Sequence, residues 1–108
     1  MTYKVFISQP MSGRTNQAIL DERAQIVDML KGIEEGLKHQ EVKVEVIESF
    51  NEEAFKRGAS PLACLGDCIK LLGEADVVVF AKNWENSKGC KVEHQCAKEY
   101  GLSIVYMK

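Results

Sequence analysis

The sequence predicts a single three-layer α/β domain spanning residues 1–108, with a small four-stranded parallel sheet and helices on both faces. Two observations predict this class. Short apolar runs alternate along the chain with longer segments of helical periodicity, which is typical of parallel sheets joined by helical crossovers. One run, Asp76–Ala81 (DVVVFA), is apolar almost throughout, as expected of a central strand buried on both faces.

The first half of the chain predicts two strands and a long helix. Tyr3–Ser8 (YKVFIS) is a β-branched apolar run that stops at a glycine-containing loop, as a first strand does. From Asn16 to about Leu37 apolar residues recur at helical spacing, with Thr15 or Asn16 as the N-cap. Val42–Ile47 alternates apolar and charged residues, which predicts a strand near a sheet edge.

The second half continues the alternation. After a loop with room for one helical turn, Ser60 has the character of an N-cap and Pro61 that of a first helical residue. In the helix that follows, expected over the segment PLACLGDCIKLLGEA (61–75), four apolar residues are expected to face the core: Leu62, Leu65, Ile69 and Leu72. A further helix is predicted from about Gly89, which lets the chain turn, to Tyr100, with Gly101 closing it before a last strand, SIVYM.

Composition narrows the class of partner. The net charge of −2 and a pI of about 5.7 give no electrostatic case for nucleic acid, and no apolar segment approaches the roughly 20 residues of a membrane span. Met1 is followed at once by a strand-like run rather than an apolar leader segment. We therefore expect a cytoplasmic protein with its four cysteines as free thiols.

The predicted topology points to a site at the carboxyl ends of the strands, where ligands bind in open α/β sheets of the flavodoxin or Rossmann type. Two loops fall there, SQPMSGRT after the first strand and KNWENSKG after the third. Arg14 and the backbone N–H groups before the long helix could hold an anion. The same loop could equally be a simple turn, and the P-loop pattern GxxxxGK[ST] is absent from the sequence.

Two carboxylates are candidates for chemistry. Glu93 lies in the first turns of the helix after the third predicted strand, where the helix dipole would favour its ionised form. Asp67 interrupts an apolar helical stretch and could complete a pair with separated pKa values. Each could instead be an ordinary surface residue, and spacing alone does not show that the two meet.

The cysteine and histidine spacings, and the tryptophan, each allow a functional and a structural interpretation. Cys64 with Cys68, and Cys90 with His94, each place two possible metal ligands one helical turn apart, which could build a zinc site. Buried free cysteine, however, behaves as a small apolar residue, and we predict no metal. Trp84 could stack on a base at the wall of a pocket or could cap the core.

The segments VFISQPMSGRT and ADVVVFAKNWENSKGCKVEHQCAKEYG carry a resemblance. They resemble the nucleoside 2-deoxyribosyltransferase-like superfamily, and in particular its short members and the 2'-deoxynucleoside 5'-phosphate N-hydrolases. The resemblance covers nearly the whole chain. It implies that Glu93 attacks the anomeric carbon of a sugar, that Asp67 assists departure of the base, and that Ser87 contacts a 5'-phosphate.

The resemblance also implies an enzyme that needs neither metal nor cofactor: an N-glycosidase of (deoxy)nucleoside 5'-monophosphates, or a related deoxyribosyltransferase, working through a glycosyl-enzyme intermediate. A homodimer or higher homo-oligomer is expected. The residues expected to line the pocket are Ser8, Gln9, Pro10, Met11, Ser12, Gly13, Arg14, Trp84, Ser87 and Gly89.

One departure from the family pattern keeps a second reading open. Family members often have a tyrosine in the first strand that holds the nucleophile, and Phe6 occupies that position here. Phenylalanine cannot donate a hydrogen bond. The alternative is therefore a nucleotide-binding or sensing domain of the same fold with little or no turnover.

Overall fold

The computed structural model describes residues 1–49, 58 and 60–108. Four parallel strands form one sheet: β1 (Thr2–Ser8), β2 (Lys43–Val46), β3 (Val77–Phe80) and β4 (Ser103–Tyr106), in the order β2-β1-β3-β4. The helices are α1 (Asn16–Gly36), α3 (Pro61–Leu72) and α4 (Lys88–Glu99), with short 3-10 turns η1 (Lys38–Gln40) and η2 (Trp84–Asn86). The predicted fold class is confirmed. The predicted helical turn before Ser60 lies in the part of the chain outside the described residues.

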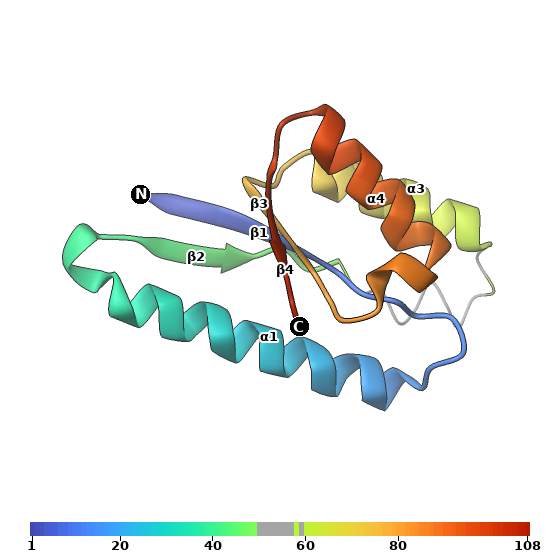
Figure 1. The fold of residues 1–108 in the computed structure, drawn as a ribbon, viewed down its shortest axis with the longest axis horizontal. Coiled ribbons are helices and arrows are strands. Elements are labelled where there is room, and N and C mark those ends of the chain that lie inside the picture. The colour runs from blue at the N-terminus through green and yellow to red at the C-terminus, as the bar shows by residue number, and fades with distance from the viewer. Residues whose placement is uncertain (50–57, 59) are drawn as a thin grey trace.

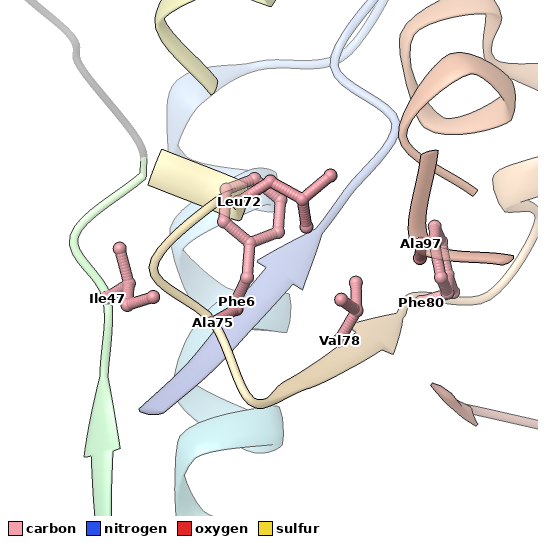
Figure 2. Packing of buried hydrophobic residues seen from close by; sticks show 7 residues of the cluster. All are labelled: Phe6, Ile47, Leu72, Ala75, Val78, Phe80 and Ala97. Atoms are coloured by element: carbon pink, nitrogen blue, oxygen red, sulfur yellow. The ribbon is translucent and has the colours of Figure 1, made fainter. Parts of the chain in front are cut away.

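The helices lie on both faces of the sheet, as Figure 1 shows: α1 on one face, α3 and α4 on the other. Each face has its own apolar cluster because side chains alternate along a strand. On the α1 side Val5 and Ile7 of β1 pack with Ile26 and Leu30. On the opposite side Phe6 packs with a second set, drawn in Figure 2: Ile47, Leu72, Ala75, Val78, Phe80 and Ala97.

Local sequence explains most of the helix boundaries. Thr15 is the N-cap of α1, where its hydroxyl accepts from the Ala18 N–H, and Ser60 caps α3 with Pro61 in the first turn. At the end of α4, Gly101 adopts a φ of 71°, the left-handed region that glycine enters without strain. The predicted caps are therefore confirmed, although α3 ends at Leu72 and α4 begins one residue earlier than expected.

The predictions about exposure are confirmed for the two strands β2 and β3 but not for one residue of α3. β2 is an edge strand with alternating exposure, and β3 is an almost fully buried inner strand, both as predicted. Leu62, however, is 76% exposed rather than part of the core. It lies in the first turn of α3, and it is Leu72, at the other end of the helix, that packs against the sheet. No described helix is long and apolar enough to cross a membrane.

Candidate active site

The strand order reverses between β1 and β3, so the carboxyl ends of these two neighbours form the switch point of the sheet. Ser8 and Phe80, the last residues of the two strands, are partners in the register. The chain leaves β3 through η2 and enters α4, which packs on the same face as Phe6 (Figure 1). Residues of α4 are thereby placed beside the end of β1, as the topology rule for ligand sites requires.

Glu93 is buried at this point. It shares the inner face of α4 with Cys90 and Ala97, because residues three and four apart lie on one side of a helix. Its side chain is only 6% exposed. Ser8 Oγ, on the face of β1 that α4 covers, donates to Glu93 Oε1 over 3.4 Å. That distance is long, since such bonds are typically about 2.8 Å. Glu93 Oε2 is buried and has no hydrogen-bond partner in the described part of the chain.

Burial controls the ionisation of this carboxyl. It raises the pKa of Glu93 from 4.5 to about 7, and the hydrogen bond from Ser8 opposes the increase. Desolvation therefore outweighs the expected effect of the helix dipole on Glu93. Glu93 is in the second turn of α4, where the dipole effect has largely faded, so desolvation decides. The acid and the carboxylate are both populated near neutral pH.

Asp67 is brought to the same neighbourhood from α3, but it is exposed. Glu93 and Asp67 both act electrostatically on Cys68, whose pKa burial raises to about 12 with smaller contributions from these two carboxylates and from neighbouring thiols. In the described part of the chain no hydrogen bond joins the two carboxyl groups. The structure thus places the predicted pair around one thiol, with one member buried and the other in contact with solvent.

Ser87 and Gly89 lie at the start of α4. Ser87 is its N-cap, and its hydroxyl accepts from the Cys90 N–H over 3.3 Å. As at any helix start, the first backbone N–H groups of α4 have no partner within the helix, apart from the one that the Ser87 hydroxyl satisfies. Gly89 does not have the role expected of it. It has no positive φ, and a Cβ there would meet only Leu65 Cδ1, at 3.8 Å, so the turn does not require glycine.

The loop after β1 is tied to α1 through Glu22, a residue that sequence reasoning missed. Gln9 is buried, and its Nε2 donates to Ile19 O and to Glu22 Oε1, each over 3.0 Å. Arg14 Nη1 donates to the same Glu22 oxygen over 2.9 Å and to Pro10 O over 2.8 Å. The positive charge of Arg14 is therefore balanced by the carboxylate of Glu22 on α1, which weakens Arg14 as a ligand for an anion.

The other members of this loop differ in exposure. Pro10 and Met11 are half-buried, whereas Ser12 and Gly13 are exposed at the tip. Gly13 has a φ of 76° with no atom near its missing Cβ, so the backbone conformation rather than space selects glycine there. The tip thus offers a hydroxyl and backbone groups, while the residues on either side of it fix its shape.

Trp84 belongs to a cluster of four rings at the carboxyl ends of β3 and β4. Its ring stacks on that of His94 with centroids 4.2 Å apart, and it also packs against Phe80 and Tyr106. His94 Nε2 and the Tyr106 hydroxyl are joined by a hydrogen bond of 2.7 Å. Half-buried Trp84 thus packs on the core, and His94 covers one of its faces. The aromatic spacing gave no sequence signal, since Tyr106 follows twelve residues after His94.

The possible metal ligands do not converge. Across residues 1–49, 58 and 60–108, no three side chains of His, Cys, Asp or Glu lie close enough together to hold an ion. Cys90 is buried next to Ser8 and Ser87, whereas His94 turns toward Trp84 and Tyr106. All four cysteines are free thiols. The described residues give no support to the zinc alternative.

A second buried polar group, also missed from the sequence, lies at the end of β2. Arg23 of α1 is 7% exposed, and its guanidinium donates to Ile47 O over 2.8 Å and to Ser49 Oγ over 3.3 Å. Ser49 Oγ in turn lies 3.4 Å from Ile7 O. Desolvation lowers the pKa of Arg23, and the nearby Glu48 works against it. These bonds connect α1 to the carboxyl ends of β1 and β2.

One surface hollow lies away from all of these residues. It is at the opposite end of the sheet and is lined by Met1, Thr2, Glu34, Glu35, Lys38, Glu41, Val42 and Lys43. Its mixed charges balance, and it includes none of the predicted site residues. This hollow is therefore separate from the candidate site at the switch point.

Comparison with known proteins identifies the family. Residues 3–106 match the model of a domain of unknown function, DUF4406, so the chain belongs to that family over nearly its whole length. No curated protein and no solved structure matches the sequence.

Proposed function

We propose that the protein is an N-glycosidase of (deoxy)nucleoside 5'-monophosphates, with deoxyribosyl transfer as a related activity, and that Glu93 is its nucleophile. One observation carries the proposal: a carboxyl group is buried at the switch point of a parallel sheet and, among the described residues, is hydrogen-bonded only by Ser8. Buried acids with strongly raised pKa values are concentrated at active sites. The resemblance of the flanking segments to the nucleoside 2-deoxyribosyltransferase-like superfamily supplies the substrate class.

In the proposed reaction ionised Glu93 attacks C1' of the sugar. The new ester bond forms as the C1'–N bond breaks, and the base leaves with that electron pair. Asp67, when protonated, or a water molecule supplies the proton that the departing base needs. Water then attacks C1', giving the free sugar phosphate and returning Glu93 to its carboxylate form with release of a proton. A second base in place of water would give transfer instead of hydrolysis.

Access to Glu93 is part of the proposal. Its Oε2 is covered in this structure, so substrate must displace neighbouring side chains before C1' can reach the carboxylate. Displacement also desolvates the reacting groups, which strengthens the interaction between the carboxylate and the developing positive charge of the sugar. The phosphate would lie at the start of α4, against the Ser87 hydroxyl and the first N–H groups of the helix.

The experiment is to incubate the protein with a panel of deoxynucleoside and ribonucleoside monophosphates, and the matching nucleosides, and to measure released base. We expect release from monophosphates by the wild type, and a loss of at least a hundredfold in Glu93→Ala and Glu93→Gln. Glu99→Gln is the matched control, because Glu99 is an exposed glutamate of the same helix that contacts only Gln95 among the described residues. Equal activity in the Glu93 variants would contradict the nucleophile assignment.

A nucleotide-binding domain with little turnover is the second candidate. Two observations favour it: the covered Glu93 carboxyl and the exposed Asp67. The same panel separates the two, because calorimetric binding of a monophosphate without base release by the wild type would establish the binding domain and end the enzyme proposal.

A further inference from the structure

Ser8 has a different relation to the site from that of a substrate-lining residue. It is the last residue of β1, is 1% exposed, and has its hydroxyl on the face of the sheet that α4 covers. Among the described residues it is the only group that hydrogen-bonds the Glu93 carboxyl. A group so fully enclosed acts on its neighbour rather than on a ligand that arrives from solvent.

We propose that Ser8 is a positioning residue whose hydroxyl fixes the orientation of the Glu93 carboxyl and favours its ionised form over the acid. A hydroxyl that donates to a carboxylate makes a stronger bond than one that donates to a neutral acid. The long 3.4 Å contact is therefore expected to tighten when Glu93 loses its proton. Ionisation at this buried position then depends on one hydrogen bond.

The neighbouring residue types explain why Ser8 is needed. Phe6 lies two residues earlier on the same face of β1, but it has no donor and is packed against Leu72 and Ile47 (Figure 2). The two guanidinium groups of the described residues are bonded elsewhere: Arg14 to Glu22 and Pro10, Arg23 to Ile47 and Ser49. Among the described residues, burial and Ser8 govern the ionisation of Glu93, and no cationic group contributes to it.

Among the described residues, the other titratable groups that act on Cys68 and Cys90 in this cluster are acids and thiols. They belong to three elements packed at the switch point and are Glu22 of α1, Asp67, Cys64 and Cys68 of α3, and Cys90 of α4. Cys90 is one helical turn from Glu93, and its thiol is also a hydrogen-bond partner of the Ser8 hydroxyl. Ser8 has a single proton to donate, so the carboxylate and the thiol compete for it, and the charged carboxylate is the stronger acceptor.

The test is a titration of Glu93 in the ligand-free protein, followed through the side-chain carboxyl carbon by NMR with labelled glutamate and assigned with Glu93→Gln. In Ser8→Ala we expect the midpoint to rise by about half to one pH unit, the size of one hydrogen bond lost from the charged form. Ser8→Thr, which keeps the hydroxyl, should stay near the wild-type midpoint. Should Ser8→Ala fail to fold, Ser8→Cys, a weaker donor, should also raise it.

Ser49→Ala is the matched control. Ser49 is another buried serine at the carboxyl ends of the strands, but its hydroxyl contacts Arg23 and Ile7 O instead of Glu93. The Ser49→Ala substitution should leave the titration of Glu93 unchanged, although it weakens the fold. An unchanged or lower midpoint in Ser8→Ala, or an equal rise in Ser49→Ala, would overturn the positioning role.

A kinetic measurement extends the test and rests on the proposed function. If Glu93 must be ionised to react, Ser8→Ala should lower base release about three- to tenfold below pH 7 and less at pH 9, where Glu93 is ionised in both proteins. A purely structural role would lower the rate equally at all pH values. The titration needs no substrate, so absence of base release in every variant would refute the proposed function and leave the positioning role to the titration alone.

Discussion

Ser8 and Glu93 are separated by 85 residues in the chain, and they meet in a buried hydrogen bond at the carboxyl ends of β1 and β3. The parallel topology produces this meeting. β3 pairs with β1 in a register that sets Ser8 opposite Phe80, and the chain then returns through α4 over the same face. A carboxylic acid in such a place costs free energy when it ionises, and this cost is measurable without any substrate.

The stability of the protein should fall as pH rises toward neutrality. The pKa of Glu93 is raised from 4.5 to about 7 in the folded chain, so the folded state holds a proton that the unfolded state has released. The free energy of unfolding is therefore largest, with respect to this group, below pH 4.5 and decreases by about 3 kcal/mol as pH rises through 7. Urea unfolding at a series of pH values measures it.

Glu93→Gln should remove most of this pH dependence, because a neutral amide does not titrate. The variant should exceed the wild type in stability at pH 8 provided that the amide finds a partner, while Glu99→Gln should keep the wild-type slope. A wild-type curve that is flat between pH 4.5 and 8 would contradict the buried-acid description of Glu93.

A second prediction concerns Arg23. Arg23→Met keeps most of the apolar stem but removes the donors to Ile47 O and Ser49 Oγ. The buried carbonyl of Ile47 then loses a partner, so the free energy of unfolding should fall by about 2–3 kcal/mol in denaturant melts. Lys31→Met, a loss of one positive charge at an exposed position of α1, should change stability by less than about 0.5 kcal/mol. Equal effects of the two substitutions would show that Arg23 is not a structural link.

The thiols offer a third prediction. Burial raises the pKa of Cys68 to about 12 and also raises the pKa of Cys90, so neither forms thiolate readily at pH 8. Because the thiolate is the nucleophile, both cysteines should resist iodoacetamide in the folded protein and react in denaturant. Mass spectrometry of peptides from each state makes the comparison. Rapid labelling of Cys90 under native conditions would show that α4 opens frequently.

Sequence periodicity predicted the framework of this fold because its signals are local. The continuous apolar run of β3, the alternation in β2 and the caps Thr15 and Ser60 are properties of a few adjacent residues, and each is confirmed. The error at Leu62 has the same origin, since helical spacing gives the face of a residue without showing how far the neighbouring layer extends.

The site was predictable only in part, because its contacts join distant segments. Glu93, Asp67 and Ser87 were given their roles through a family resemblance; local pattern left the two carboxylates open as ordinary surface residues and did not select Ser87. Nothing in the sequence linked Glu22 to Gln9 and Arg14, or Arg23 to the end of β2, because these contacts depend on the packing of α1 against the strand ends. The raised pKa of Glu93 likewise depends on burial, which residue type does not reveal.

Ser87 gives the last prediction, because its N-cap role and its proposed phosphate contact can be separated. Ser87 and Ser60 are both N-caps, of α4 and α3, and their hydroxyls accept from the third helical N–H over 3.3 Å and 3.1 Å. Replacement of either by alanine should lower the free energy of unfolding by about 1 kcal/mol. Only Ser87→Ala should raise the KM for a nucleoside monophosphate, about tenfold, because only that hydroxyl is proposed to donate to the phosphate. The KM for the corresponding nucleoside should stay within twofold of wild type, and an equal rise for both substrates would place the phosphate elsewhere.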